Sequence, residues 1–256
     1  MNDIKIRPPF CRQGNKYNML DYILPLIPNH LIYVELFLGS GVVFFNKSKA
    51  KINVLNDLDK GIISNLKLLK KASKNPEDYN QNLNTIPKLK TFFSNHSSSI
   101  EDQLLYEKIK SCDGYGGKPV LKENYIFKNN NPFSIFNNIQ VYQDKLKGTK
   151  LLSKNYDEII DKFDSTNTFF YIDPPYENTN ESFGYAEASH FDFERFAEKI
   201  KKIQGYFLIT INDSAYIRKL FKHYNIQKIN VRNVWFNNTT NKTKIRKELI
   251  ITNYII

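Results

Sequence analysis

A β-prone run that ends at two prolines restricts the fold more than any other feature of this chain. Residues 168–172 (TFFYI) have the composition of a buried strand, and the next four residues are Asp173-Pro174-Pro175-Tyr176. Proline has no N–H to donate to a neighbouring strand, so a strand inside a sheet must end there. The prolines also restrict the backbone, which presents a carboxylate, a carbonyl and an aromatic ring together at the strand's end.

Strand-like and helix-like segments alternate along the chain. Strand candidates are residues 31–37, 52–55, 168–172, 206–211, 226–235 and 248–256. Apolar residues have helical spacing in 62–69 and 193–203, a helix is expected to start at the apolar run 42–45 after a glycine turn, and a short helix is expected to end at 221. Asp192 is a candidate helix cap. This alternation predicts an α/β fold with a mostly parallel sheet, helices on both faces and a C-terminal antiparallel hairpin. Ligands of such sheets bind beyond the carboxyl ends of the strands.

Residues 75–150 differ in character from the rest of the chain. They contain Asn, Ser and Lys clusters and only short apolar fragments. A length of 256 residues is enough for one main core with a modest insertion. We therefore predict one domain formed by residues 1–74 and 151–256, with 75–150 inserted as a mainly helical subdomain.

Charge and cysteine usage narrow the functional class. Lys and Arg outnumber Asp and Glu by 37 to 26, and the net charge of +11 favours a polyanionic partner, above all nucleic acid. A chain rich in lysine and asparagine can also reflect an AT-biased genome, so charge alone does not decide. Cys11 and Cys112 lie far apart without His or Cys at ligand spacing, which predicts neither a disulfide nor a metal site. No apolar run has signal-peptide or membrane-spanning length, so we expect a cytoplasmic protein, of a bacterium or of a phage- or virus-infected host, without a membrane partner.

A glycine turn follows the first strand candidate. Gly39 and Gly41 permit a tight turn and close approach of a ligand to the backbone, and Asp57, sixteen residues beyond Gly41, follows the next strand candidate. A carboxylate at that place can accept hydrogen bonds from ribose hydroxyls. A dinucleotide-binding fingerprint would need a third glycine where this chain has Phe44, so the pattern disfavours NAD. Taken alone, Gly-x-Gly is also compatible with an ordinary turn.

The tetrapeptide 173–176 suits an amine on a flat base. The Asp173 carboxylate and the Pro174 carbonyl can accept hydrogen bonds from an exocyclic amino group and so direct its lone pair at an electrophile, while Tyr176 stacks on the ring. No nucleophilic side chain is needed. The alternative is a proline turn with a solvated aspartate and a core tyrosine.

These motifs resemble those of the Dam-type DNA adenine-N6 methyltransferases, the class in which the cofactor motif precedes the recognition segment and the catalytic motif follows it. The resemblance rests on Gly14-Asn15-Lys16, Glu35-Leu36-Phe37-Leu38-Gly39-Ser40-Gly41, Asn56-Asp57, Asp173-Pro174-Pro175-Tyr176, Ile211-Asn212-Asp213-Ser214 and Arg246-Lys247-Glu248-Leu249-Ile250. It thus spans nearly the whole chain.

The resemblance implies a Rossmann-like, S-adenosylmethionine-dependent methyltransferase that needs no metal and methylates a flipped-out adenine in double-stranded DNA. The inserted subdomain would recognise the target, and the enzyme would act as a monomer, with a restriction endonuclease acting on the same site as a candidate partner. The implied catalytic residues are Asp173, Pro174, Pro175 and Tyr176, and the implied cofactor-binding residues are Arg12, Lys16, Glu35, Phe37, Gly39, Gly41, Asp57 and Asp173.

Three positions depart from the family pattern. Asn15 replaces a glycine, Leu36 replaces a proline, and Arg12 stands where some members carry an aromatic residue. Two other functions use the same constellation: a catalytically silent DNA-binding module, and a methyltransferase acting on the cytosine amine or on RNA. An intact tetrapeptide argues against the silent module.

Two basic segments are candidates for DNA contact. Residues 118–128 of the predicted insertion interleave lysines with aromatics, and residues 217–256 carry nine Lys or Arg against one Glu. The turn at 237–244 is a candidate for reaching into a groove or along the phosphate backbone.

Overall fold

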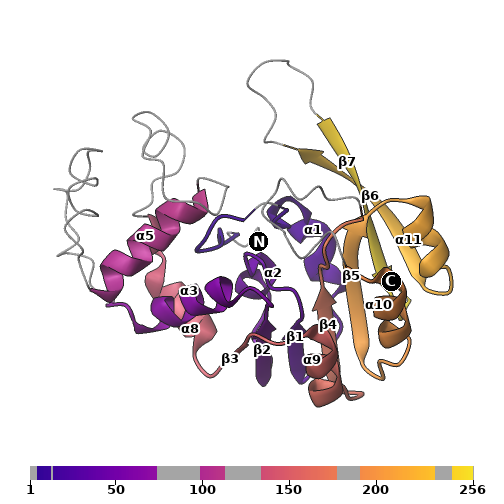
Figure 1. The fold of residues 1–256 in the computed structure, drawn as a ribbon, viewed down its shortest axis with the longest axis horizontal. Coiled ribbons are helices and arrows are strands. Elements are labelled where there is room, and N and C mark those ends of the chain that lie inside the picture. Colours follow the sequence, from indigo (N-terminus) through magenta and orange to yellow (C-terminus); the bar gives the residue numbers. More distant parts are fainter. Residues whose placement is uncertain are drawn as a thin grey trace.

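A computed structural model describes residues 5–12, 14–73, 99–112, 134–177, 191–233 and 244–255. They form a seven-stranded sheet of order β3-β2-β1-β4-β5-β7-β6 (Figure 1). Its strands are β1 (Ile32–Glu35), β2 (Ile52–Asn56), β3 (Lys150–Leu152), β4 (Thr168–Ile172), β5 (Tyr206–Asn212), β6 (Asn225–Asn233) and β7 (Lys244–Thr252). Strands β1 to β5 pair in parallel, and β7 runs antiparallel to β5 and β6. The predicted α/β fold with a closing hairpin is confirmed.

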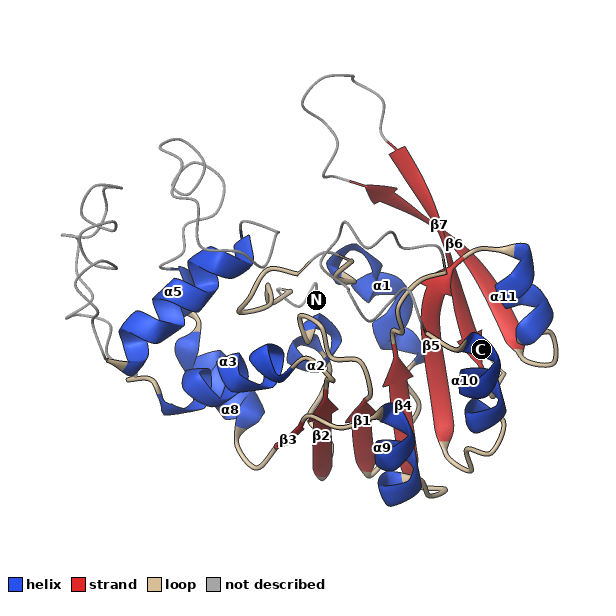
Figure 2. Ribbon diagram, in the orientation of Figure 1, coloured by secondary structure: helices blue, strands red, loops and turns tan. Residues whose placement is uncertain are grey.

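Helices cover both faces of the sheet (Figure 2). They are α1 (Leu20–Ile23), α2 (Val42–Asn46), α3 (Lys60–Lys71), α5 (Ile100–Cys112), α7 (Ser134–Asn137), α8 (Ile139–Leu146), α9 (Tyr156–Phe163), α10 (Phe193–Ile200) and α11 (Ala215–Leu220), with 3-10 turns at Tyr17–Met19 and Leu24–Leu26. Asp192 caps α10 as predicted, because its side chain accepts a hydrogen bond from the Arg195 N–H at 2.9 Å. None of the described helices is long and apolar enough to cross a membrane.

Two hydrophobic clusters lie on opposite faces of the sheet, because successive strand residues point to opposite sides. Tyr33 and Leu55 belong to the cluster under α1, α2, α3, α5 and α8, whereas their neighbours Val34 and Val54 belong to the cluster under α9, α10 and α11. Strands β1, β2 and β4 are buried along nearly their whole length. The sheet therefore provides a rigid base for the loops at its carboxyl edge.

Several predicted boundaries are wrong. The last strand ends at Thr252 rather than 256, because the Asn253 side chain accepts a hydrogen bond from Phe207 N–H at 2.9 Å and donates one to Gly205 O at 2.8 Å, which takes the place of further strand pairing. That strand also begins at Lys244 rather than 248. The first strand is shorter than predicted, the helix predicted over 193–203 ends at Ile200, and β3 and α9 were not predicted.

The described helices of the predicted insertion pack against the main domain. Buried side chains of α5 and α8 share one core cluster with those of α2 and α3. The Tyr142 ring lies 5.3 Å from that of Phe45, and its hydroxyl donates a hydrogen bond to Arg7 O at 2.9 Å. Residues 118–128 lie outside the described residues, and the division of the chain at 74/75 and 150/151 remains a prediction.

Candidate active site

The loops after β1 and β4 lie side by side at the carboxyl edge of the sheet. These two strands pair in parallel with Glu35 opposite Tyr171, and Leu36 N–H donates a hydrogen bond to Tyr171 O at 3.2 Å. The glycine turn and the Asp-Pro-Pro-Tyr segment therefore leave the sheet next to each other, as expected for a ligand site in an α/β sheet.

Asp173 is held by partners from two distant parts of the chain. Its Oδ2 lies 2.6 Å from the Lys16 ammonium, and its Oδ1 accepts a hydrogen bond from the Thr210 hydroxyl at 3.1 Å. Lys16 also donates to Gly14 O at 2.9 Å, and its side chain is only 3% exposed. Burial raises the pKa of Asp173, while the Lys16 charge and the hydrogen bonds from Lys16 and Thr210 oppose that shift. The carboxylate is thus fixed in direction before any substrate arrives.

Tyr176 is anchored at its hydroxyl. This group donates a hydrogen bond to Glu248 Oε2 at 2.7 Å, and the Lys16 ammonium lies 4.9 Å from the centroid of the ring. Glu248 is fully buried on β7 and forms an ion pair with Arg246 at 2.5 Å. The far end of the ring is therefore held in place.

The glycine turn is tied to Asp57. Gly39 N–H donates to Asp57 Oδ2 at 2.8 Å, and Asp59 N–H donates to Oδ1 at 3.0 Å. Burial raises the pKa of Asp57 to about 6, although both backbone donors and the charge of Arg12 oppose the shift. Each oxygen of the Asp57 carboxylate thus already accepts one hydrogen bond from the backbone. From the sequence we expect hydrogen bonds from ribose hydroxyls alone. A carboxylate has about four lone-pair sites, so acceptor capacity remains.

The two glycines of the turn differ in their surroundings. Both have positive φ, 52° at Gly39 and 67° at Gly41. A Cβ built on Gly39 would meet no atom within 4 Å, whereas one on Gly41 would lie 3.1 Å from Leu38 and 3.3 Å from Phe45. Gly39 therefore faces open space, whereas Gly41 is packed.

Arg12 lies beside the acidic loop after β2. Its Nη2 is 2.7 Å from Asp59 Oδ2, with one third of the Arg12 side chain exposed. Asp59 caps α3 by accepting from Gly61 N–H at 2.7 Å. The contact places Arg12 at the edge of the site near Asp57 and pairs it with a carboxylate.

Glu35 and Phe37 lie on opposite sides of the sheet. Glu35 is buried and accepts a hydrogen bond from the Tyr33 hydroxyl at 2.7 Å, and burial raises its pKa to about 8. Phe37 packs in an aromatic group with Tyr156 and Phe196, at centroid distances of 5.6 and 6.2 Å. Both side chains thus have protein partners.

A family model describing the D12 class N6 adenine-specific DNA methyltransferases matches residues 13–234. The chain belongs to this family. It is 23% identical over 232 residues to the type II methyltransferase M.CviBI of Paramecium bursaria Chlorella virus NC1A, covering 86% of this chain and 88% of the relative. It is 22% identical over 273 residues to the type II methyltransferase M.MjaIII of Methanocaldococcus jannaschii, covering 88% and 91%. A solved precorrin-6y methyltransferase of Geobacter metallireducens is similar with a TM-score of 0.41 and 8% identity, covering 95% and 92%.

This D12-class methyltransferase is therefore an enzyme of DNA methylation, and its family implies S-adenosylmethionine as methyl donor. The open space at Gly39 and the spare acceptor capacity of Asp57 fit an adenosine moiety at the glycine turn. Among the described residues, no group of three or more His, Cys, Asp or Glu is arranged to hold a metal ion.

Two groups at the candidate site were given no role from the sequence, although Glu248 stands in the segment Arg246–Ile250 that carries the resemblance. Thr210 binds Asp173, and Glu248 binds Tyr176. A signal for Glu248 was present, since a lone acid precedes the apolar run 249–251 and a charge in such a run needs a buried partner. Thr210 carries no comparable signal, because threonine is common in strands.

Proposed function

We propose that this methyltransferase transfers a methyl group from S-adenosylmethionine to the N6 amine of an adenine flipped out of double-stranded DNA, at a specific sequence. The observation that carries the proposal is the fixed Asp173 carboxylate, bound by Lys16 and Thr210, at the end of β4 beside the glycine turn. The family supports adenine as the target base.

Asp173, Pro174 and Tyr176 receive the base, and Pro175 restrains their backbone. The Asp173 carboxylate and the Pro174 carbonyl accept hydrogen bonds from the amine, which directs the nitrogen lone pair at the methyl carbon. When bound, S-adenosylmethionine supplies a methyl group on a positively charged sulfonium. The amine nitrogen would form a bond to that carbon as the carbon–sulfur bond breaks and a neutral thioether leaves, and the nitrogen would release one proton to solvent. Catalysis then consists of positioning and charge stabilisation, and flipping explains why an aromatic ring stands beside the carboxylate.

The cofactor would lie along the glycine turn. Gly39 leaves room for it, Gly41 shapes the turn, and Asp57 accepts hydrogen bonds from the ribose. Arg12, Lys16, Glu35 and Phe37 would border or support this site, and Asp173 would lie between cofactor and base. The contacts of Arg12 and Glu35 with protein groups favour a role at the edge for the first and a supporting role for the second.

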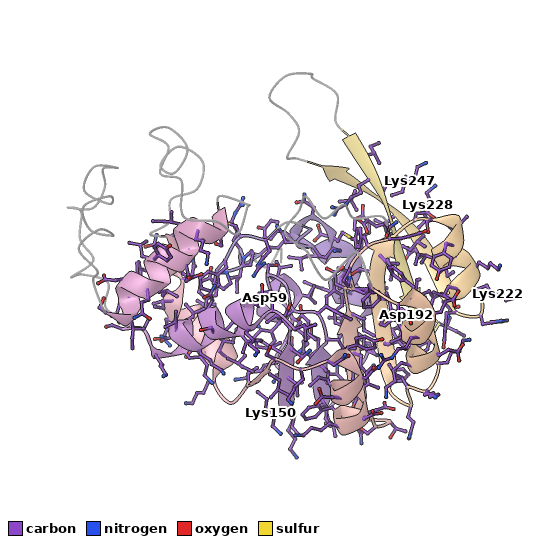
Figure 3. The ribbon with its side chains drawn as sticks, in the orientation of Figure 1. Asp59, Lys150, Asp192, Lys222, Lys228 and Lys247 are labelled. Atoms are coloured by element: carbon purple, nitrogen blue, oxygen red, sulfur yellow. The ribbon has the colours of Figure 1, made fainter. Side chains whose placement is uncertain are left out.

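The exposed face of the terminal hairpin would contact DNA phosphates. Lys228 and Lys247 are exposed. The pKa of Asp213 is lowered mainly by the hydrogen bond from Arg218, and the charges of these two lysines lower it further, so both lie near Asp213. Figure 3 shows both lysines on the hairpin and Lys150 at the opposite edge of the sheet. Ser214, at the start of α11, also donates a hydrogen bond to Glu177, the residue after Tyr176, so this basic surface adjoins the catalytic loop.

Residues 75–150 would recognise the target in a monomeric enzyme.

Methyl transfer from tritium-labelled S-adenosylmethionine tests the proposal. Wild-type protein, Asp173→Ala and the surface control Asp161→Ala are incubated with unmethylated DNA, and the product nucleosides are separated. N6-methyladenine is expected with wild type and the control and not with Asp173→Ala. Label in cytosine or RNA refutes the adenine assignment. Cofactor binding without transfer to any nucleic acid favours a silent binding module.

A further inference from the structure

Glu248 is a buried carboxylate outside the predicted site. It lies on β7, with 0% of the residue exposed, next to the apolar Leu249, Ile250 and Ile251. Moving a carboxylate out of water is costly unless hydrogen bonds and an opposite charge compensate. An apolar residue at this position would avoid that cost. The groups that Glu248 contacts should therefore show why an acid stands at this position.

Its partners point towards the catalytic tetrapeptide. Oε2 accepts the hydrogen bond from the Tyr176 hydroxyl at 2.7 Å, and Oε1 lies 2.5 Å from Arg246 Nε. Arg246 and Glu248 are two residues apart on β7 and so share one face of the strand, with the Arg246 side chain 34% exposed. The charges of Lys16 and, less strongly, Arg246 offset that of the carboxylate, while the side-chain hydrogen bond comes from Tyr176.

The strand pairing fixes Glu248 relative to the reacting groups. Residue 248 lies opposite Asn212 on β5, two residues beyond Thr210, and Thr210 binds Asp173. The same three-strand unit, β4-β5-β7, thus carries the carboxylate that receives the amine and the carboxylate that holds the ring. Sites held by strands are positioned more precisely than sites on loops, so the sheet restricts the relative positions of the two acceptors.

We propose that Glu248, supported by Arg246, is a positioning residue that sets the orientation of the Tyr176 ring for stacking on the target base. The inference rests on the proposed function, because it takes Tyr176 as the base-stacking residue. A tyrosine ring turns about two side-chain bonds. A hydrogen bond at the hydroxyl fixes where the far end of the ring lies, which restricts the first rotation, and it favours one ring plane because the hydroxyl hydrogen prefers to lie in the plane of the ring. In this role Glu248 acts on the base through the Tyr176 ring, to which it is hydrogen-bonded.

Steady-state kinetics of four variants test the proposal: Glu248→Ala, Glu248→Gln, Tyr176→Phe and the double variant Glu248→Ala/Tyr176→Phe. Glu248→Ala and Tyr176→Phe each remove the hydrogen bond and should lower kcat by about tenfold or more, because misplacing a reacting partner slows the chemical step. The double variant should lose less than about twofold more than the worse single variant, because both changes remove one interaction. Glu248→Gln keeps an acceptor oxygen and should restore most of kcat. The Kd of S-adenosylmethionine should stay within about twofold throughout, since the hydrogen bond acts on the base side.

A matched control separates positioning from stability. Ile250→Val lies on the same face of β7 but in the core cluster other than the one that Tyr176 packs against, so it should lower the Tm but leave kcat unchanged. Losses that multiply in the double variant, equal losses in Glu248→Gln and Glu248→Ala, or full activity of Glu248→Ala overturn the proposal.

Fluorine NMR tests the position of the Tyr176 ring without any measurement of activity, so it applies even if the proposed function is wrong. In fluorotyrosine-labelled protein, the fluorine signal missing from Tyr176→Phe should shift or broaden in Glu248→Ala and stay unchanged in Ile250→Val. An unchanged signal in Glu248→Ala overturns the positioning role. If the wild-type protein methylates cytosine or RNA instead, the adenine assignment fails, but the positioning role of Glu248 can still be tested by comparing the variants on that substrate.

Discussion

Lys16 and Asp173, 157 residues apart in sequence, form an ion pair of 2.6 Å between the N-terminal segment and the end of β4. The pair is largely shielded from water, with side chains 3% and 21% exposed. The pair connects the segment Gly14-Asn15-Lys16 with the tetrapeptide 173–176, and the sequence placed each of these two motifs at the site independently. Removing either partner leaves an uncompensated charge where the amine is expected to bind.

Lys16→Met should therefore lose both activity and stability. Breaking a buried pair costs about 3–5 kcal/mol, and about 2–4 kcal/mol is expected here because Asp173 retains some access to water. Urea unfolding measures this change. The control Lys199→Met breaks the pair with Asp161, whose side chain is 71% exposed, and should cost less than about 1 kcal/mol. Equal costs in both variants would contradict the buried role of Lys16.

Alanine at the two glycines of the turn should separate binding from folding. Gly39→Ala introduces a methyl group into open space, so unfolding free energy should fall by only about 1 kcal/mol while cofactor affinity drops at least about tenfold. Gly41→Ala adds contacts with Leu38 and Phe45 to the same backbone strain and should cost about 2 kcal/mol or more. Titration calorimetry and thermal unfolding measure the two effects. Unchanged cofactor affinity in Gly39→Ala would move the cofactor away from this turn.

Cofactor binding should weaken in acid through Asp57. A pKa of about 6 means that protonation below that pH removes acceptor capacity for the ribose, so the Kd of S-adenosylmethionine should rise by up to about tenfold per pH unit there. For the free protein the sign is opposite: the folded-state pKa is raised, so the contribution of Asp57 to stability is present below the unfolded pKa and is lost as pH rises through about 6. Equilibrium dialysis between pH 5 and 8 measures the Kd, and Asp57→Asn should remove this pH dependence. A wild-type Kd that is flat across the range would exclude ribose recognition by Asp57.

The hairpin lysines should contribute to DNA affinity through phosphates. Lys228→Ala/Lys247→Ala should weaken binding to a random-sequence duplex and reduce the slope of log affinity against log salt by about 1.8, because each phosphate contact contributes about 0.9. Lys150→Ala, at the far edge of the sheet, serves as the control and should leave the slope unchanged (Figure 3). Fluorescence anisotropy at several salt concentrations gives the slope. An unaltered slope in the double variant would place the DNA elsewhere.

Local patterns of the sequence were enough for much of the architecture. Residues 168–172 form a strand that stops at the prolines, 62–69 lie in a helix, and Asp192 caps the helix that follows it. Each of these depends on near neighbours, on periodicity or on a missing N–H, which the sequence displays directly. The last strand was misplaced because its ends depend on pairing with Asn233 and on the side chain of Asn253, which are not local signals.

The sequence by itself thus determined the fold class, the family and the two loops that carry its motifs. Only the tertiary structure decided which polar groups meet in the site: Lys16 pairs with Asp173, and Glu248 accepts a hydrogen bond from Tyr176, 72 residues away. The order of strands, with β7 placed beside β5, brought Glu248 to the ring of Tyr176. Burial then makes these pairings strong, because a charge shielded from water must find its partner within the protein.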